Sequence, residues 1–307
     1  MYVELRSPNI HEPENIAAYN NTILNYRDTD FFLWAGGTEI MSRADFYPAV
    51  RGNMEIISLD KIEELHHFLR NDRYAEFGAM VSINEIAQAG KLVLPRILLD
   101  TINSTACRTV RERITIGGSL CTQRFKTSLA STLMILDAAV ELRYMKKRMH
   151  SKWFQLSRIY DKNGTLSIPE GALLSKVRIA IQQYDYQFFR TMGSPVRDPE
   201  NALSMALVAR FEQNSVSYAR IIFTLPSRGF CYNRDLDNMI TSLHLPVSIS
   251  RYGQVEDFVL DFIKDNFKDI PHLQESRIRG AFHDMIKDMN EKVLSYTGAI
   301  ERQQQDR

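Results

Sequence analysis

The chain has 307 residues, of which 44% are hydrophobic, and its 38 lysines and arginines balance 37 aspartates and glutamates. This length suits two domains with sizeable cores, and the balanced charge gives no electrostatic reason to expect nucleic acid or an anionic membrane as a partner. No apolar run approaches the about 18 residues of a membrane-spanning helix, and the first residues lack the basic and apolar regions of a signal peptide, so we expect a soluble, cytoplasmic protein.

The first third of the chain alternates strand-like and helix-like segments. Strands are predicted at residues 30–35 and 54–59, and a helix at 13–25. The helix is indicated by apolar residues at helical spacing, namely Ile16, Tyr19, Ile23 and Leu24. The opening therefore reads β-α-β-α-β, which is typical of a small, mainly parallel sheet.

The next segment, from about residue 74 to 168, has a different pattern. Short strands at 75–80, 114–117 and 138–145 alternate with helices at 83–89, 94–104 and 127–136. This pattern predicts a second α+β lobe of the same domain, which we expect to span residues 1–172. The boundary is placed in a passage rich in turn residues, 161–176.

The remainder is predicted to form a smaller α+β domain over residues 173–298, followed by a frayed polar tail, 299–307. It has strands near 176–190 and 216–225 with a helix at 199–212 between them. Two apolar stripes predict closing helices, one with Val255, Phe258, Val259, Phe262, Ile263 and Phe267, the other with Ile278, Phe282, Met285, Ile286, Met289 and Val293. The stripes indicate core positions, with a partner-binding face as the alternative.

Two glycine pairs each follow a short apolar run. The run Phe31–Trp34 ends in Gly36-Gly37, and the run 114–116 ends in Gly117-Gly118. A strand, a glycine turn and a helix start place several backbone N–H groups together, which suits a phosphate, although each pair could also be an ordinary tight turn. Two such turns converging on one elongated ligand would suit a dinucleotide.

The cysteines and histidines exclude several kinds of site. Cys107, Cys121 and Cys231 are odd in number and widely spaced, so no disulfide framework is expected. They cannot supply the four closely spaced thiolates of a plant-type iron–sulfur cluster. The histidines show no metal-ligand spacing, so we expect no metal site.

Four ordered motifs carry a resemblance to a known family. Residues 34–40, WAGGTEI, resemble the AGGT(D/E) segment of the FAD-binding subunit of molybdenum hydroxylases, the xanthine dehydrogenase and carbon monoxide dehydrogenase family. Residues 57–65 and 77–82 are similar to the family's next two segments, and residues 110–118 with 136–138 match its VR..TIGG…LDA pattern. The resemblance implies a two-lobed α+β FAD-binding domain of the vanillyl-alcohol-oxidase type, followed by a smaller C-terminal α+β domain.

The resemblance also implies which residues bind the cofactor. The first motif would wrap the pyrophosphate with backbone amides, the second glycine pair would line the same cavity, and two later residues would lie near the flavin. The expected FAD-binding residues are Leu33, Trp34, Ala35, Gly36, Gly37, Thr38, Glu39, Ile40, Thr115, Ile116, Gly117, Gly118, Ser119, Thr127, Ser128, Leu174 and Arg190. No catalytic side chain is expected, because flavin electron transfer needs neither an acid–base pair nor a nucleophile.

The chain departs from the family at two of these positions. The family usually has Asn after TIGG and, nine residues later, an Asp that reaches the cofactor, where this chain has Ser119 and Ser128. Because one charge-assisted hydrogen bond is worth about 1.5–3 kcal/mol, FAD is expected to be more easily dissociated here. Arg124 and Lys126 flank Phe125 in the same loop, where they could meet phosphate or an acidic partner, or simply be solvated.

The function implied is that of an electron-transfer flavoprotein subunit. Electrons would come from an iron–sulfur subunit and a molybdopterin-binding subunit, and FAD on this chain would pass them to NAD+ or another acceptor. The alternatives are a flavin-free scaffold or assembly subunit of the same family, which Ser119 and Ser128 would favour, and a nucleotide-binding sensor, which would bind ADP as well as FAD.

Overall fold

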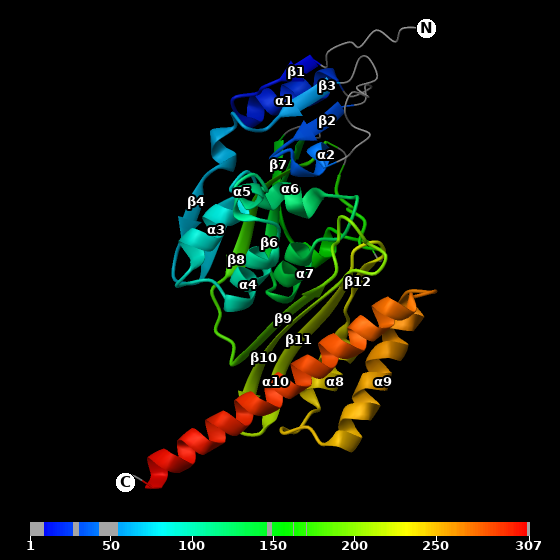
Figure 1. The fold of residues 1–307 in the computed structure, drawn as a ribbon. Helices are drawn as coiled ribbons and strands as arrows, with labels where there is room; N and C mark the ends of the chain where they lie inside the picture. Colours follow the sequence, from blue (N-terminus) through cyan, green and yellow to red (C-terminus); the bar gives the residue numbers. More distant parts are fainter. Residues whose placement is uncertain are drawn as a thin grey trace.

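The computed structural model describes residues 9–26, 31–42, 55–145, 149–161, 163–169 and 171–305. Three sheets follow one another along the molecule, as Figure 1 shows, with the N-terminal sheet at one end and the C-terminal helices at the other. The structure is α+β, as the sequence predicts.

The first sheet has three parallel strands in the order β1-β3-β2. Its elements are β1 (Asn9–His11), α1 (Ile16–Asn25), β2 (Phe31–Trp34), α2 (Thr38–Met41) and β3 (Glu55–Ser58). Helix α1 begins after Asn15, whose side chain accepts a hydrogen bond from the Ala18 N–H at 2.8 Å. The predicted β-α-β-α-β opening and its small parallel sheet are confirmed.

The second sheet has five antiparallel strands in the order β4-β5-β8-β6-β7. Its strands are β4 (Phe68–Arg70), β5 (Tyr74–Gly78), β6 (Ala139–Met145), β7 (Met149–Gln155) and β8 (Leu173–Ala180). The helices of this lobe are α3 (Ile83–Gly90), α4 (Arg96–Ser104), α5 (Arg108–Arg111), α6 (Ile116–Cys121) and α7 (Ser128–Ile135), with short 3₁₀ turns at Glu63–Leu65 and Leu156–Arg158.

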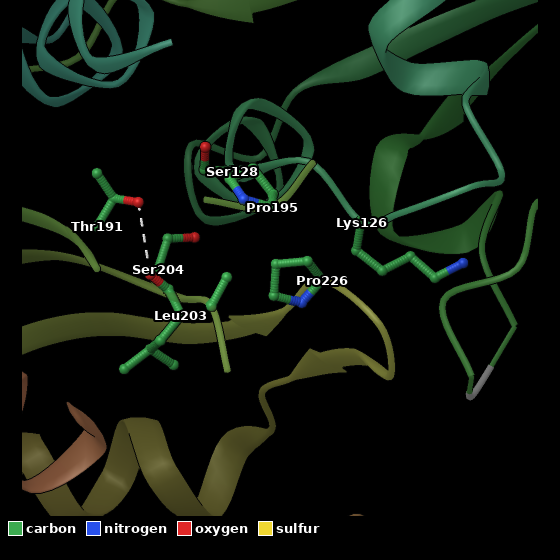
Figure 2. Close-up of a pocket in the computed structure, with 8 residues that line it drawn as sticks. Lys126, Ser128, Thr191, Pro195, Leu203, Ser204 and Pro226 are labelled. Carbon is green, nitrogen blue, oxygen red and sulfur yellow. Dashed lines mark hydrogen bonds between the residues drawn. The ribbon is translucent and has the colours of Figure 1, made fainter. Parts of the chain in front are cut away.

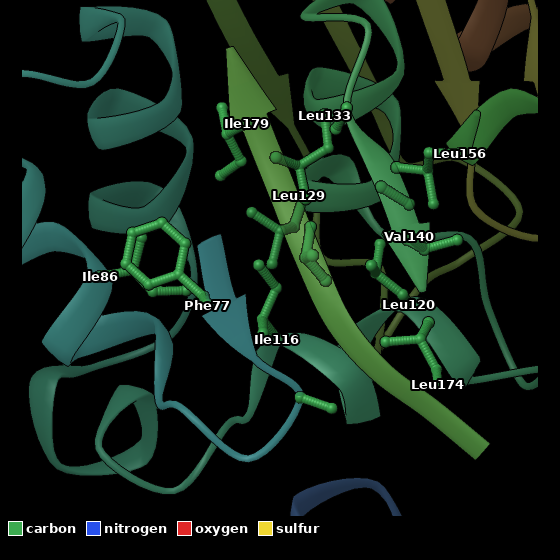
Figure 3. Close-up of a cluster of buried hydrophobic side chains, with 14 of the residues drawn as sticks. Phe77, Ile86, Ile116, Leu120, Leu129, Leu133, Val140, Leu156, Leu174 and Ile179 are labelled. Atoms are coloured by element: carbon green, nitrogen blue, oxygen red, sulfur yellow. The ribbon is translucent and has the colours of Figure 1, made fainter. Parts of the chain in front are cut away.

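The core of this lobe lies between the sheet and its helices. Figure 3 shows side chains of α6 and α7 against those of β5, β6 and β8. Every residue of α7 after Ser128 is buried, so this helix is enclosed on all sides.

The domain boundary differs from the predicted one. Strand β8 pairs with β5 on one side and β6 on the other, so it is the middle strand of the second sheet. A boundary between residues 172 and 173 would remove that strand, and the first domain therefore ends after Ala180. Turn residues before β8 mark a loop between two strands of one sheet and not a domain linker.

The C-terminal domain is a four-stranded antiparallel sheet in the order β12-β11-β10-β9, covered on one face by helices. The strands are β9 (Tyr186–Met192), β10 (Leu203–Glu212), β11 (Ser215–Leu225) and β12 (Gly229–Cys231), and the helices are α8 (Arg234–Thr241), α9 (Ile249–Asn266) and α10 (His272–Gln305). The other face of the sheet packs against α4 and α7 of the first domain. Both faces of this sheet are therefore covered.

Three predicted elements are wrong. The predicted helix at 199–212 is strand β10, the predicted strand at 176–190 is two strands, and the predicted strand at 114–117 forms only one bridge, Ser82 to Thr115, before α6 starts. In β10, residues 203–209 are all buried, because one face meets the helices and the other meets the first domain. Such a strand loses the apolar–polar alternation that would identify it.

The two apolar stripes of α9 and α10 are core positions, as predicted, and most of their residues belong to the buried cluster of the C-terminal domain. Phe258 is the exception, with 42% of its surface exposed. Helix α10 continues to Gln305, through most of the segment predicted to be frayed. Within the described residues, no helix has both the length and the apolar character needed to cross a membrane.

Candidate functional site: two glycine turns and a pocket between the domains

The first glycine turn connects β2 to α2. Gly37 has φ of +73° and is the N-cap of α2, with no side chain to cap the helix. A Cβ on Gly37 would overlap the Trp34 ring, and one on Gly36 would overlap the carbonyl oxygen of Arg113. Both positions thus require glycine, the first for its backbone conformation and the second for close packing.

The second glycine pair lies inside the first turn of α6. Its amides are already used within the protein, since Gly117 N–H donates to Ala79 O at 2.9 Å and Gly118 N–H donates to Thr115 Oγ1 at 3.1 Å. A Cβ on Gly117 would overlap Ala79, and one on Gly118 would overlap Thr115 Oγ1 and lie 3.5 Å from the Cβ of Ala35. The two turns therefore meet, as expected for one ligand, but the second serves as a closely packed wall.

Side chains tie the two turns together. Thr122 Oγ1 donates to Glu39 Oε2 at 2.7 Å, and Arg124 Nη1 donates to Ser42 Oγ at 3.1 Å. These bonds hold the loop after α6 against α2. Glu39 of the first motif therefore links α2 to the loop after α6, and Arg124 is hydrogen-bonded to Ser42 at the end of α2.

The loop after α6 leads to the start of α7. Thr127 is the N-cap of α7, because its Oγ1 accepts from Ala130 N–H at 3.2 Å, and the same hydroxyl donates to Ser119 O at 3.3 Å. Ser128, the next residue, lies at a pocket between the two domains (Figure 2). The predicted residues Ser119, Thr127 and Ser128 thus form one continuous path from the glycine turns to this pocket.

The pocket is small, and the empty space at its lining, about 210 Å³, includes open solvent. Its lining comes from the loop before α7, from β9 and β10, and from the turns after β9 and β11, through Lys126, Ser128, Thr191, Pro195, Ala202, Leu203, Ser204 and Pro226. Burial lowers the pKa of the Lys126 ammonium, and nearby Asp161 partly offsets this effect. Near the glycine turns, burial raises the pKa of the Cys121 thiol to about 12, so this thiol stays neutral.

Four hydroxyl groups follow the path from the first turn to the pocket. Within the part of the chain that the structure describes, the hydroxyls of Thr38, Ser119, Ser128 and Ser204 have no hydrogen-bond partner. We refer to these four residues as the hydroxyl row. By contrast, Thr127 in the same region bonds other parts of the protein. Unbonded, half-buried or buried hydroxyls are the groups that a polar ligand can satisfy.

Two predicted residues lie elsewhere. Leu174 is 5% exposed and packs in the core near Leu120 of α6. Arg190 points to the helix-covered face of the C-terminal sheet, where its Nη2 lies 2.8 Å from Asp284 Oδ2. Its neighbour Thr191 faces the first domain, because successive side chains of a strand alternate between the two faces.

The sequence did not predict Ser204 and Thr191 as residues of this pocket. Both lie in the hairpin of β9 and β10, one strand of which was predicted as a helix. The pairing of Thr191 with Ser204 across the hairpin places both on one face. A serine within an otherwise apolar strand, as in Leu203–Ala209, was the one signal available.

This arrangement is that of an α+β protein with two glycine turns packed against each other and a small pocket between its two domains. Residues 6–180, more than half of the chain, match the family model described as "FAD binding domain in molybdopterin dehydrogenase". The chain belongs to this family, and its cofactor is FAD.

Solved structures share the fold over almost the whole chain. A chain of quinoline 2-oxidoreductase from Pseudomonas putida 86 matches with a TM-score of 0.74 and 14% identity, over 95% of this chain and 99% of that one. A chain of carbon monoxide dehydrogenase from Hydrogenophaga pseudoflava matches with a TM-score of 0.74 and 14% identity, over 93% and 96%. A chain of carbon monoxide dehydrogenase from Oligotropha carboxidovorans matches with a TM-score of 0.73 and 16% identity, over 93% and 97%. No curated protein matches the sequence.

The residues present fit FAD. A phosphate needs N–H donors near a glycine turn, which the uncapped start of α2 supplies. The rest of the cofactor offers acceptor atoms, and the hydroxyl row offers unbonded donors.

Proposed function

We propose that this chain is the electron-transfer flavoprotein subunit of a molybdenum hydroxylase complex of the xanthine dehydrogenase type. In this proposal the chain receives electrons from iron–sulfur clusters on a partner and delivers them to NAD+ or another acceptor. The observation that carries it is the continuous path from the first glycine turn, past Ser119 and Ser128, to the pocket between the domains.

The side chains have distinct roles along this path. The backbone of Gly36 and Gly37 and the hydroxyl of Thr38 would hold the pyrophosphate, with Gly118 and Ser119 forming the facing wall. FAD, when bound, supplies the ability to accept and release one or two electrons. The protein positions and shields the cofactor, and no acid or base on this chain is needed.

The cysteine content supports a role within a complex. The whole chain contains three cysteines, fewer than the four thiolates of a plant-type cluster, so the clusters must be carried by another subunit. The substrate would be oxidised on a molybdopterin-binding subunit. The odd, widely spaced cysteines also favour a cytoplasmic location, where thiols remain reduced.

The test is purification of the complex from the native host through a tag on this chain. Co-purification of an iron–sulfur subunit and a molybdopterin-binding subunit, with FAD in a 1:1 ratio to this chain, is the expected result. Recovery of a free monomer that oxidises NADH without other subunits would contradict the proposal.

The flavin-free scaffold that Ser119 and Ser128 would favour does not agree with the family match, which gives FAD as the cofactor. A nucleotide-binding sensor is the second candidate. It would bind ADP as tightly as FAD, so a competition titration with ADP separates it from the electron-transfer subunit.

A further inference from the structure

Helix α2, which follows the first glycine turn, is not stabilised from within. It consists of the single turn Thr38–Met41, its N-cap Gly37 has no side chain to cap it, and none of its residues is buried. One helical turn is not stable by itself in water, and this turn gains nothing from a buried face. Its shape, and with it the direction of the N–H groups at the glycine turn, must therefore depend on contacts from outside the segment.

Such contacts come from the loop that follows α6, which lies beside α2 (Figure 1). Thr122 Oγ1 donates a hydrogen bond of 2.7 Å to Glu39 Oε2, and Arg124 Nη1 donates one of 3.1 Å to Ser42 Oγ. Ser42 Oγ in turn donates to Glu39 O at 2.7 Å, at the C-terminal end of α2. We refer to these bonds among Thr122, Glu39, Arg124 and Ser42 as the latch. Its bond to the Glu39 carboxylate is of the charge-assisted kind, which is stronger than a bond between neutral groups.

The loop that carries Thr122 and Arg124 is itself anchored at both ends. At its start, Tyr160 Oη donates to Leu120 O at 2.8 Å, and the Leu120 side chain is buried in the core. At its end, Lys126 N–H donates to Pro226 O at 2.8 Å. The latch therefore connects the exposed turn of α2 to a support that is fixed by the packed part of the protein.

We propose that Thr122 is a positioning residue that, through the latch, holds the first glycine turn in its phosphate-binding shape before FAD arrives. This inference rests on the proposed function, in which Gly36 and Gly37 hold the pyrophosphate. Thr122 acts through Glu39 and needs no contact with the cofactor. A turn that is ordered in advance loses less entropy on binding, so the latch raises the affinity without adding a contact to FAD.

The test measures how tightly Thr122→Val binds FAD and ADP, which carries the same pyrophosphate, in the full chain. The variant keeps the branched side chain and loses the hydroxyl. Because one hydrogen bond to a charged group is lost, both affinities should fall by the same factor, roughly tenfold. Thr241→Val is the matched control, since Thr241 Oγ1 donates a bond of 2.9 Å to Asn238 O in the C-terminal domain. It should leave both affinities unchanged.

Two further variants complete the experiment, with the folding of each checked by circular dichroism. Thr122→Ser keeps the hydroxyl and should bind FAD like the wild type, whereas Thr122→Ala should repeat the loss seen with valine. Wild-type FAD affinity in the folded valine and alanine variants, or a loss for FAD that ADP does not share, would overturn the role of Thr122 while leaving the proposed function intact. Wild-type chain that binds no FAD would overturn the proposed function itself.

Discussion

At the scale of single residues, the two glycines of the first motif have different reasons to be glycine. Gly37 adopts a left-handed backbone with the Trp34 ring against it, whereas Gly36 lies against the main chain at Arg113. The motif therefore encodes both a turn and a contact between two parts of the chain. Under the proposed function, these packing conditions are what would hold its N–H groups toward the FAD phosphates.

Substitution of Gly37 tests this dual role. Gly37→Val places a β-branched side chain at positive φ, which costs on the order of 1–3 kcal/mol, and should abolish FAD binding while circular dichroism still reports a folded protein. Gly253→Val in α9, where a Cβ would have no neighbour within 4 Å, is the matched control and should bind FAD normally. A folded Gly37→Val variant with wild-type FAD affinity would refute the assignment.

Ser128→Asp tests the other end of the path. The new carboxylate would lie in the first turn of α7 and near the unbonded hydroxyl of Ser204, where it could accept from donors that serine reaches poorly. We expect FAD to bind about tenfold more tightly in a fluorescence titration, corresponding to roughly 1.4 kcal/mol. Ser128→Asn, of equal size but uncharged, should give a smaller gain. Weaker binding by the aspartate variant would show that the loop is shaped for serine.

At the scale of elements, the sequence was informative where one face of an element is solvated. Helices α1, α3 and α4, each with exposed residues, were predicted within a few residues of their observed bounds, as was the β-α-β-α-β opening. Helix α7 was also predicted, although it is buried along its whole length after Ser128. Strand β10 was missed because burial on both faces removes the period of two. The same error hid Ser204, since a serine in a predicted helix has no defined neighbour on β9. The glycine turns, in contrast, could be found because their backbone geometry restricts the residue type.

Substitution of Glu141 on β6 tests how much its hydrogen-bond and charge network stabilises the five-stranded sheet. Although burial raises the pKa of this carboxyl, hydrogen bonds from Ser151 and Ser175, with the charges of Arg143 and Lys176, bring the pKa below its ordinary value. Because the folded-state pKa is lowered, the stabilisation is present above the unfolded pKa and is lost as the pH falls through the folded one. Glu141→Gln should lower the unfolding free energy at pH 7 by about 1–3 kcal/mol and reduce its dependence on pH in the acid range.

Urea denaturation between pH 3 and 7 would measure both effects. Glu112→Gln is the control, since among the described residues the Glu112 carboxylate forms an exposed pair with Arg108 at 3.2 Å, and such pairs contribute about 0–1 kcal/mol. If the two variants behave alike, the Glu141 network contributes nothing beyond an exposed ion pair.

At the scale of the whole molecule, the C-terminal sheet belongs to two cores. Ala206, Val208 and Ile222 pack with the first domain, while the opposite face of the same strands packs with α8, α9 and α10. The segment that connects β8 to β9 is also held in place, because Tyr184 stacks on Tyr218 and Arg210 Nε donates a hydrogen bond to Gln183 O at 3.3 Å. The relative position of the domains, on which the pocket depends, is thus set by packing on both sides.

Two fragments test where the first domain ends. A fragment of residues 1–183 contains all five strands of the second sheet and should unfold cooperatively on heating, whereas a fragment of residues 1–172 lacks β8 and should not. Thermal circular dichroism distinguishes them. Equal cooperativity of the two would place the boundary before β8.

The position of β8 also has a consequence for synthesis on the ribosome. Strands β4 and β5 emerge as one hairpin and β6 and β7 as another, but the strand that joins them is made last of the five. Until residue 180 has left the exit tunnel, both hairpins present unpaired edges, which are prone to pair with other chains. At about 5–20 residues per second, this exposure lasts for seconds, so nascent chains of this protein should depend on chaperones that shield strand edges.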